Sequence, residues 1–455
     1  MAGSPYIVTD TVVVFPSYTL TIEPGVIVKF DANMLIELRQ AALVAMGTAS
    51  DSITFTSNSI IPTPGVFVGL ILNGGSMKSK FNYCNFRYAF TGITGGGDSI
   101  IVKNSDFSFN TYGYWGGTPA ILDSSNFAHN VTFGASFVNS TVNYCTASYN
   151  GVGLRSSTNG NRINHCIINN NQTGIGGDGS LGAQGFSAHH CSINYNQTGV
   201  DAAMSCRVYN CNVIGNQTGI KATYILQDGL VVNNTIIDSN AVVGINISNR
   251  GDSIYSCQIK FNGVGIIDNN IDNFWQTYIT KNAIENNAIG LELLNTPDNI
   301  SCNKICNNIS YDLKYTGNTS FSLPNNYFCT PDSASTAAVV YDGYDNINLG
   351  LLNFMPLDNV CYLTIPDINT GVSSHDSPFS SFNIYPNPIT NVLNINLGNY
   401  EPTEIILYDL SSRKVLQVTF TNTTTINTEQ LAKGMYLYEL RNKNGVIKNG
   451  KVIKQ

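Results

Sequence analysis

The sequence predicts an all-β protein: a parallel β-helix of about a dozen coils followed by a small C-terminal β-sandwich. Three observations predict this fold. A short motif recurs at a nearly constant spacing, two columns of apolar residues keep step with it, and the final stretch of the chain follows neither pattern. A β unit of 20–25 residues that stacks on copies of itself is one coil of a β-helix.

The recurring motif reads NQTGI at 171–175, NQTGV at 196–200 and NQTGI at 216–220. Its wider frame is Asn, two residues, Gly and an apolar residue, and this frame occurs on other coils as well. The NQT triplets match the glycosylation acceptor pattern, but acceptors must face solvent. A side-chain amide on every coil can instead bond the backbone and the next Asn. We therefore predict a buried ladder that includes Asn150, Asn171, Asn196, Asn216 and Asn262.

The two apolar columns predict the interior of the stack, since period-2 strands punctuated by Gly and Asn indicate β-structure. One column is Phe86, Phe107, Phe127, Ala147, Ile168, Ile193, Val213, Ile236, Ile259, Ile284 and Ile305. The other, five residues earlier, is Phe81, Val102, Leu122, Val142, Ile163, Ala188, Val208, Val231, Ile254, Ile279 and Ile300. We expect the Gly of the motif to use positive φ and the Asn to tolerate a left-handed corner.

Ten of the eleven cysteines fall into two groups. Cys84, Cys145, Cys166, Cys191, Cys211 and Cys257 share one column of the repeat, which predicts buried free thiols. Cys302, Cys306, Cys329 and Cys361 leave that column near the end of the stack. A cross-link there would hold the last coils together, so we predict a disulfide among these four without choosing the pairs. The alternative, a zinc site at Cys302 and Cys306, is disfavoured because no His lies nearby in sequence.

The two ends of the array carry distinctive segments. They are TLTIEPGVIVKF (19–30), LIELRQAALVAMGT (35–48), SITFTS (52–57) and NNYFCTPDSASTAAVVYDGYDNINLGLLNFMPL (325–357). These segments resemble the first coil and the closing segment of bacterial secreted right-handed β-helix proteins. The resemblance covers roughly residues 6–360 and implies a right-handed β-helix, which we assign to residues 1–366. It implies no particular chemistry, since that fold carries lyases, hydrolases, adhesins and scaffolds.

After a Ser-rich linker at 367–381, residues 382–455 form short strands and turns typical of a small β-sandwich. Their landmarks are Tyr385, Pro386, Asn387 and Pro388, the YDL at 408–410, Gly434 and Tyr436 in LAKGMY, and the final KVIK at 451–454. They resemble the type A C-terminal sorting domain of the type IX secretion system, although Ser412 replaces its usual Gly. This resemblance implies the secretion machinery as partner and a location outside the outer membrane, secreted or on the cell surface.

Composition excludes several classes of partner. The net charge is -7 and only 12% of the residues are charged, so no electrostatic footprint for nucleic acid or anionic lipid is visible. No apolar run is long enough to span a membrane. The first twenty residues lack the basic and apolar regions of a signal peptide. Cargo of the type IX system needs a Sec signal, so the chain departs from that pattern here.

Candidate catalytic residues come from the outward position two residues after the Gly, which holds Arg155, Gly176, Asp201, Lys221 and Asn246. Asp201 and Lys221 should face each other one coil apart, as in a surface ion pair. β-Helix hydrolases pair Asp residues on adjacent coils, whereas lyases combine acidic calcium ligands with an Arg or Lys base. No two acids share this column on successive coils, so an active site would need loop residues such as Asp178.

Two further sets of side chains were weighed as binding sites. His165 and His190 occupy one position on neighbouring coils and could ligate a metal or bind a sugar, but such a pair is more often a polar stripe, here with Tyr144 and Asn210. We therefore predict no metal site and no cofactor. The aromatic candidates for stacking on sugar rings are Tyr114, Trp115 and Trp275.

Three functions fit these observations. The first is a secreted or surface-displayed protein that is structural, adhesive or glycan-binding, with an extracellular polysaccharide or a cell-surface glycan as partner. The second is a polysaccharide lyase or glycoside hydrolase with a loop-borne active site. The third, a periplasmic metal-handling protein, conflicts with the outward direction of the sorting domain. Since no catalytic constellation is visible, the first is favoured.

Overall fold

The computed structural model of the protein divides into two compact units, Met1–Val372 and Ser373–Gln455. It describes residues 4–74, 78–96, 99–177, 183–222, 229–248, 251–269, 277–295, 299–357, 361, 383–385, 389–396, 402–409, 413–442 and 445–454. The linker predicted at 367–381 lies outside these residues, so its boundaries and the end of the β-helix at 366 stay predictions.

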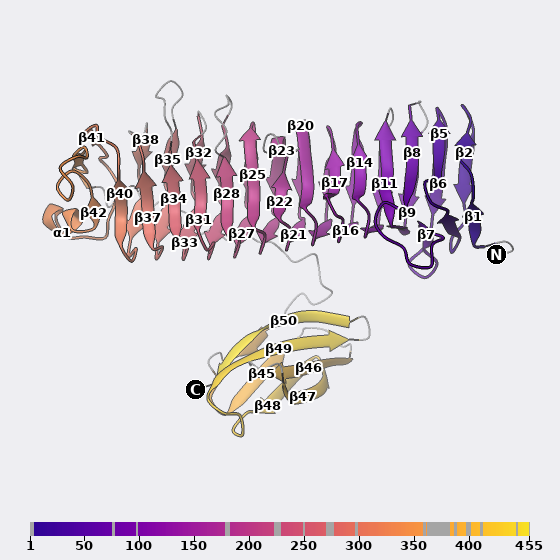
Figure 1. The fold of residues 1–455 in the computed structure, drawn as a ribbon. Helices are drawn as coiled ribbons and strands as arrows, with labels where there is room; N and C mark the ends of the chain where they lie inside the picture. Colours follow the sequence, from indigo (N-terminus) through magenta and orange to yellow (C-terminus); the bar gives the residue numbers. More distant parts are fainter. Residues whose placement is uncertain are drawn as a thin grey trace. The chain divides into compact units, whose positions relative to one another are not determined.

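The first unit is a parallel β-helix of about 13 turns, which confirms the predicted fold class. Successive coils stack in sequence order from the N-terminus to α1 (Ser333–Ala337), the α-helix of the described chain (Figure 1). Each coil contributes a strand to three rows, here called A, B and C. Row A is a 14-stranded parallel sheet, and rows B and C are joined at β20 into a 27-stranded sheet.

The strands of row A are short and lie between two corners of each coil. They are β1 (Tyr6–Val8), β4 (Ile27–Phe30), β7 (Ile53–Ser57), β10 (Cys84–Arg87), β13 (Asp106–Ser108), β16 (Asn126–Ala128), β19 (Thr146–Ser148), β21 (Ile167–Asn169), β24 (Ser192–Asn194), β27 (Asn212–Ile214), β30 (Ile236–Asp238), β33 (Gln258–Lys260), β36 (Ala283–Glu285) and β39 (Lys304–Cys306).

Row B follows row A on each coil, and from β14 to β40 each of its strands follows a ladder Asn. Its strands are β2 (Val12–Val14), β5 (Leu35–Arg39), β8 (Phe67–Asn73), β11 (Ala89–Gly96), β14 (Tyr112–Gly116), β17 (Phe133–Phe137), β20 (Val152–Asn164), β22 (Thr173–Gly176), β25 (Thr198–Met204), β28 (Thr218–Ala222), β31 (Val243–Ile247), β34 (Val264–Asp268), β37 (Ile289–Leu293), β40 (Tyr311–Tyr315) and β42 (Val340–Tyr341).

Row C precedes row A of the next coil. Besides the end of β20 it comprises β3 (Thr19–Ile22), β6 (Ala42–Met46), β9 (Lys80–Asn82), β12 (Ile100–Lys103), β15 (Ala120–Asp123), β18 (Thr141–Asn143), β23 (Ala183–His189), β26 (Arg207–Tyr209), β29 (Val231–Asn233), β32 (Ser253–Tyr255), β35 (Tyr278–Thr280) and β38 (Asn299–Ser301).

The predicted apolar columns line the interior of rows A and C. In row A the rings of Phe55, Phe86, Phe107 and Phe127 stack in succession, with centroids 4.8, 4.6 and 5.1 Å apart. One coil departs from the predicted register. Ile237, not Ile236, pairs with Val213, and Val232, not Val231, pairs with Val208. Ile237 stands three residues before Asn240, as Val213 stands before Asn216, so the predicted column was one residue out here, and each one-residue step along a strand moves the side chain to the opposite face.

The predicted Asn ladder is confirmed and is longer than expected. Asn196 is 2% exposed and Asn216 is 1% exposed. The Nδ2 of each ladder Asn donates to Oδ1 of the Asn on the next coil, for example from Asn196 to Asn216 at 3.1 Å. The ladder runs through Asn110, Asn130, Asn150, Asn171, Asn196, Asn216, Asn240, Asn262, Asn287 and Asn308, and it ends on Asp312.

The corner geometry corrects two expectations. The left-handed residue is the one before the ladder Asn, such as Tyr195 at φ 57°, and not the Asn itself. The Gly of the motif does not have positive φ in the described coils. It is needed because the coils approach closely: a Cβ on Gly199 would lie 2.4 Å from the carbonyl oxygen of Gly219.

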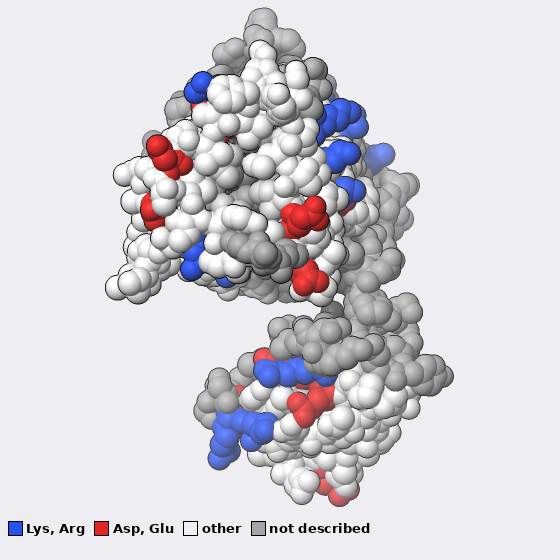
Figure 2. Space-filling model, turned by 90° about the vertical axis from the view of Figure 1, so that its right-hand side faces the viewer, with Lys and Arg blue, Asp and Glu red and all other residues white. Residues whose placement is uncertain are grey.

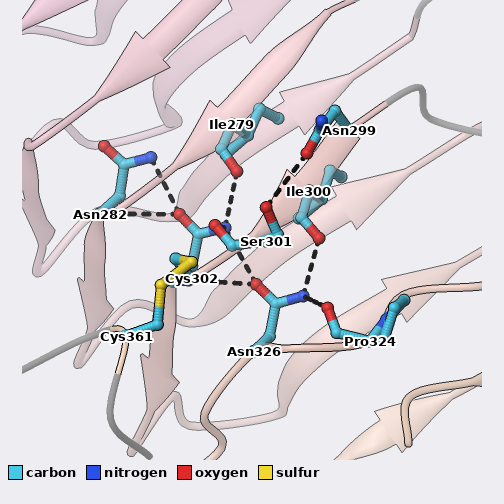
Figure 3. The surroundings of a disulfide bond; sticks show 10 residues. Ile279, Asn282, Asn299, Ile300, Ser301, Cys302, Pro324, Asn326 and Cys361 are labelled. Carbon is cyan, nitrogen blue, oxygen red and sulfur yellow. Dashed lines mark hydrogen bonds between the residues drawn. A yellow bond between two sulfur atoms is a disulfide. The ribbon is translucent and has the colours of Figure 1, made fainter. Parts of the chain in front are cut away.

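The six column cysteines are buried and free, as predicted, and so is Cys206. Beyond Cys257 the same column becomes a second Asn ladder, Asn282 to Asn303 to Asn326, which the sequence analysis missed. The predicted cross-link is confirmed and is double, since Cys302 pairs with Cys361 and Cys306 pairs with Cys329. Figure 3 shows the first disulfide beside this second ladder.

The end of the stack is closed by the segment expected to close it. Strand β42 pairs with β40 and so covers the last edge of row B. Strand β41 (Phe321–Ser322) pairs with β43 (Leu352–Asn353), and α1 begins at the N-cap Asp332 between them. Phe328 and Leu352 are buried in this closing segment.

The second unit contains two antiparallel sheets around one core. One sheet has the order β44 (Asn383–Tyr385), β45 (Val392–Asn396) and β48 (Thr423–Asn427). The other has the order β47 (Lys414–Thr421), β46 (Pro402–Tyr408), β49 (Gly434–Asn442) and β50 (Gly445–Lys454). Both sheets bury apolar side chains in a shared core that includes Leu393, Ile405 and Val452, as in a β-sandwich. Nowhere in the described chain is a helix long and apolar enough to span a membrane.

Candidate functional site

An aromatic cluster lies on the outer side of row B, near the corner that follows the ladder Asn. Phe90 and Trp115 are 47% and 41% exposed. Tyr112, which stands between them in the sequence, is half-buried. The ring of Tyr112 contacts Phe90, Trp115 and Phe133, with centroid distances of 5.2, 5.3 and 4.5 Å. Phe133 is only 3% exposed and forms the floor of this cluster.

The register of the coils builds this cluster. Tyr112 pairs with Phe133 and Trp115 pairs with Ser136, so residues about 20 apart in sequence become neighbours. Arg155 lies one coil further, with its guanidinium carbon 5.4 Å from the centre of the Phe133 ring. The sequence analysis missed Phe90 and Phe133, although Phe133 stands directly before Gly134 as Tyr112 stands before Gly113.

Of the three predicted glycan contacts, Trp115 belongs to this cluster, Tyr114 does not, and Trp275 lies outside the described residues. Tyr114 is 0% exposed inside the β-helix, so its prediction as a glycan contact is wrong. Burial raises the pKa of its phenol. The motif contained the signal, because Tyr114 follows Gly113 and so occupies the inward apolar position. Gly116 leaves room for the ring, since a Cβ there would lie 2.4 Å from the phenol oxygen.

The predicted catalytic candidates do not come together as an acid pair. Asp201 and Lys221 are paired in register, as expected, and Lys221 Nζ lies 3.6 Å from Asp201 Oδ1. Arg155 shares their outward column but points its guanidinium over Phe133. Asp178 lies outside the described residues. The two described acid–base partners therefore form an ion pair at the surface, the kind of contact that contributes little to stability.

His165 and His190 stack face to face with ring centroids 5.0 Å apart, and Tyr144 stacks on His165 at 5.1 Å. All three have positive φ at one corner of successive coils. No group of three or more His, Cys, Asp or Glu side chains in the described part of the chain is placed to hold a metal ion. The stacked rings form the predicted stripe along this corner.

The sorting motif residues are distributed over the second unit. Tyr385 ends β44, and Pro386, Asn387 and Pro388 lie outside the described residues. Gly434 begins β49 with a φ of 151°, a backbone conformation that favours glycine. Tyr436 is buried, and its hydroxyl donates to the carbonyl oxygen of Ala432 at 2.8 Å. This hydrogen bond ties the LAKGMY turn to its own strand.

Comparison with known families agrees with the C-terminal assignment. Residues 383–455 match the family described as the secretion system C-terminal sorting domain. The chain therefore carries a type IX sorting domain, which indicates export to the cell surface or beyond and contact with the secretion machinery. No curated protein matched the chain.

Among solved structures, the chain is similar to the periplasmic alginate epimerase AlgG, over 70% of this chain and 85% of that one. The two share 14% sequence identity with a TM-score of 0.37. An alginate lyase from Paenibacillus sp. str. FPU-7 is similar over 75% of this chain and 99% of that one, at 13% identity and a TM-score of 0.18. Likenesses this distant carry no argument about function.

Proposed function

We propose that this exported β-helix protein binds extracellular glycans through the aromatic cluster of Phe90, Tyr112, Trp115 and Phe133. The observation that carries the proposal is the pair of exposed rings, Phe90 and Trp115, held on either side of Tyr112 over a buried floor. A contiguous apolar patch that stays exposed on a folded protein is typical of an interaction surface. Sugars suit it, because the C–H faces of a pyranose ring pack on aromatic faces while its hydroxyls remain in water.

The rigidity of the site supports the same proposal. The four rings contact one another and stand on β-strands, so little side-chain freedom would be lost on binding. Arg155 adds a guanidinium at the edge of the cluster, where it could donate to a sugar hydroxyl. Export by the sorting domain would bring this surface to the place where extracellular polysaccharides and cell-surface glycans are found.

The test is a glycan array with the purified protein, followed by titration of the best ligands. Tyr112→Ala and Trp115→Ala should each weaken binding by roughly tenfold, the effect of losing an aromatic contact of about 1.4 kcal/mol. Phe261→Ala is the matched control, since Phe261 is 56% exposed on a coil remote from the cluster. No binding to any glycan, or equal losses in all three variants, would refute the proposal.

The same experiment tests the enzymatic alternative, a polysaccharide lyase or glycoside hydrolase. Each bound polysaccharide is incubated with the protein and assayed for reducing ends and for unsaturated uronates. Release of either product would replace the binding proposal with a catalytic one. Binding without release would favour an adhesive or structural role.

A further inference from the structure

The outward face of row C carries an unusual distribution of charge. Its outward positions alternate with the buried residues Val142, Ile163, Ala188, Val208, Val232, Ile254, Ile279 and Ile300. From β18 to β38 these positions hold Ser, Thr, Asn, His, Tyr, Val and Arg side chains. Two arginines stand among them and no carboxylate, in a chain whose net charge is -7.

The two arginines also differ from most cations of the β-helix. Lys103, Lys221, Lys260, Lys304 and Lys314 each form an ion pair with a carboxylate one coil away, and so does Arg87. Arg162 and Arg207 are exposed and have no ion pair with any described residue. Their positive charge is therefore not neutralised by the described surface. Figure 2 faces the N-terminal end of the β-helix and shows several Lys and Arg side chains along one side of this end, and a few elsewhere on it.

The register places the two guanidinium groups in one line. Arg162 pairs with Ser187, and Ser187 pairs with Arg207, so the arginines lie two strands apart, roughly 9.6 Å. That line runs along the axis of the stack and across the strands. Two strand spacings approximate the length of a disaccharide in an extended polysaccharide, so the anionic groups of such a chain could meet both arginines.

The side chains between the arginines are polar and partly fixed. His189 Nε2 lies 2.7 Å from Ser187 Oγ, and the His189 ring contacts the edge of Tyr209 with centroids 5.1 Å apart. Burial lowers the pKa of His189, and the nearby His190 and Arg162 lower it further. The ring is therefore mostly neutral at pH 7, and it offers hydrogen bonds while the arginines supply the charge.

We propose that this face of row C, with Arg162 and Arg207 as its anchors, binds an anionic polysaccharide laid along the axis of the β-helix. A guanidinium presents a planar fork of donors that matches a carboxylate or a sulfate. Tyr209 lies on the same strand as Arg207, and Tyr255 lies two coils further along the same face, with rings that suit sugar contacts. A dense polyanion such as DNA fits less well, because two arginines do not offset the charge of an acidic protein. The site is separate from the aromatic cluster on row B and does not depend on it.

The experiment titrates the full chain with a polyuronate, a sulfated polysaccharide, a neutral glucan and duplex DNA at low and at 0.5 M salt. The proposal expects saturable binding of one or both anionic polysaccharides, loss of that binding in salt, and no competition by the neutral glucan. Whether the polyuronate or the sulfated chain binds more tightly identifies the anionic group. No binding of either one, or DNA binding of equal strength, would overturn the proposal.

Four variants locate the site. Arg162→Ala and Arg207→Ala should each weaken binding by roughly tenfold, as expected for a charged hydrogen bond, and Arg162→Lys should lose less. Arg87→Ala removes the same charge from an ion-paired residue of row A and should change binding less than twofold. If Arg87→Ala costs as much as the other two, only net charge matters and the site is refuted. Thermal melting of each variant checks folding, and Trp115→Ala tests the row B proposal independently.

Discussion

At the scale of the residue, the ladder asparagines account for much of the order in the β-helix interior. Asn216 makes four side-chain hydrogen bonds. Its Oδ1 accepts from the N–H and the Nδ2 of Asn196 at 2.8 and 3.1 Å, and its Nδ2 donates to Asn240 Oδ1 and the carbonyl of Ile193, both at 3.0 Å. All four partners lie on neighbouring coils. The side chain therefore replaces water for groups that the stack has buried.

Substitution Asn216→Ala should lower the free energy of unfolding by about 1–3 kcal/mol, because it leaves buried donors and acceptors unpaired on both neighbouring coils. Chemical denaturation followed by circular dichroism measures the change. Gln217→Ala is the matched control, since Gln217 is exposed and adjacent in sequence. An unchanged denaturation midpoint in Asn216→Ala would contradict the ladder's role in stability.

Asp312 ends the ladder and makes stability depend on pH. Its Oδ1 accepts from the N–H and Nδ2 of Asn308, yet burial raises the pKa of this carboxyl to about 6 from 3.8. Between those values the folded state binds a proton that the unfolded state does not. The contribution of this protonation to the free energy of unfolding is fully present below pH 3.8 and is lost as the pH rises through 6.

Asp312→Asn should therefore gain stability relative to the wild type, on the order of 2 kcal/mol, between pH 4 and pH 7. Denaturation midpoints of both proteins at pH 4, 5, 6 and 7 measure this difference. Glu23→Gln removes an exposed carboxylate and should show no such trend. A constant difference between Asp312→Asn and the wild type over this range would show that Asp312 does not titrate there.

At the scale of the element, the passage from row A into row B requires three different residues on each regular coil. A left-handed residue turns the chain, the Asn bonds to both neighbouring coils, and the Gly lets two backbones approach. Tyr195, Asn196 and Gly199 show this order. Bulky residues at the left-handed position cost energy in isolation, and rings such as Phe109, His129 and Tyr149 stack there on successive coils.

The column of thiols makes a prediction at this scale. Native protein treated with a thiol reagent at pH 7 should leave Cys145, Cys166, Cys191 and Cys211 unmodified, and all four should react after unfolding. These side chains are at most 1% exposed, so a reagent cannot reach them in the folded protein, and burial also raises the pKa of Cys166 and Cys211. Peptide mass spectrometry identifies the labelled residues. Rapid labelling of the native column would mean that these side chains face outward and that the register is wrong by one residue.

At the scale of the whole molecule, the two units use different architecture. The β-helix pairs its strands in parallel, whereas the C-terminal unit is antiparallel throughout its described sheets and has its own core. A domain with its own core can fold independently of the stack. The family match of residues 383–455 gives this unit a role in export.

Deleting 382–455 should leave the β-helix folded but retain the protein inside the cell. The comparison uses a host with a type IX secretion system, and both versions carry the same Sec signal. Fractionation and immunoblotting measure the amounts in the periplasm, at the surface and in the medium. The intact protein in a strain without that system is the control and should also be retained. Equal export of both versions would contradict the sorting role.

If the domain is removed after export, the cleavage site should lie within 367–381. An accessible polar linker is where a processing protease reaches the backbone. Mass spectrometry of the exported form locates its C-terminus. A terminus within the β-helix or within the sandwich strands would contradict this expectation.

The sequence by itself determined the periodic features of this protein: the parallel stack, the inward columns, the Asn ladder, the thiol column and the sorting domain. Each of these repeats in step with the coil or matches a contiguous motif, so local spacing carries the information. The tertiary structure alone decided the pairing of Cys302 with Cys361 and the grouping of Phe90 and Trp115 around Tyr112. These depend on which residues lie one coil apart, and the coils differ in length. Only the hydrogen-bonded register between strands specifies those neighbours, as it does for Arg162 and Arg207.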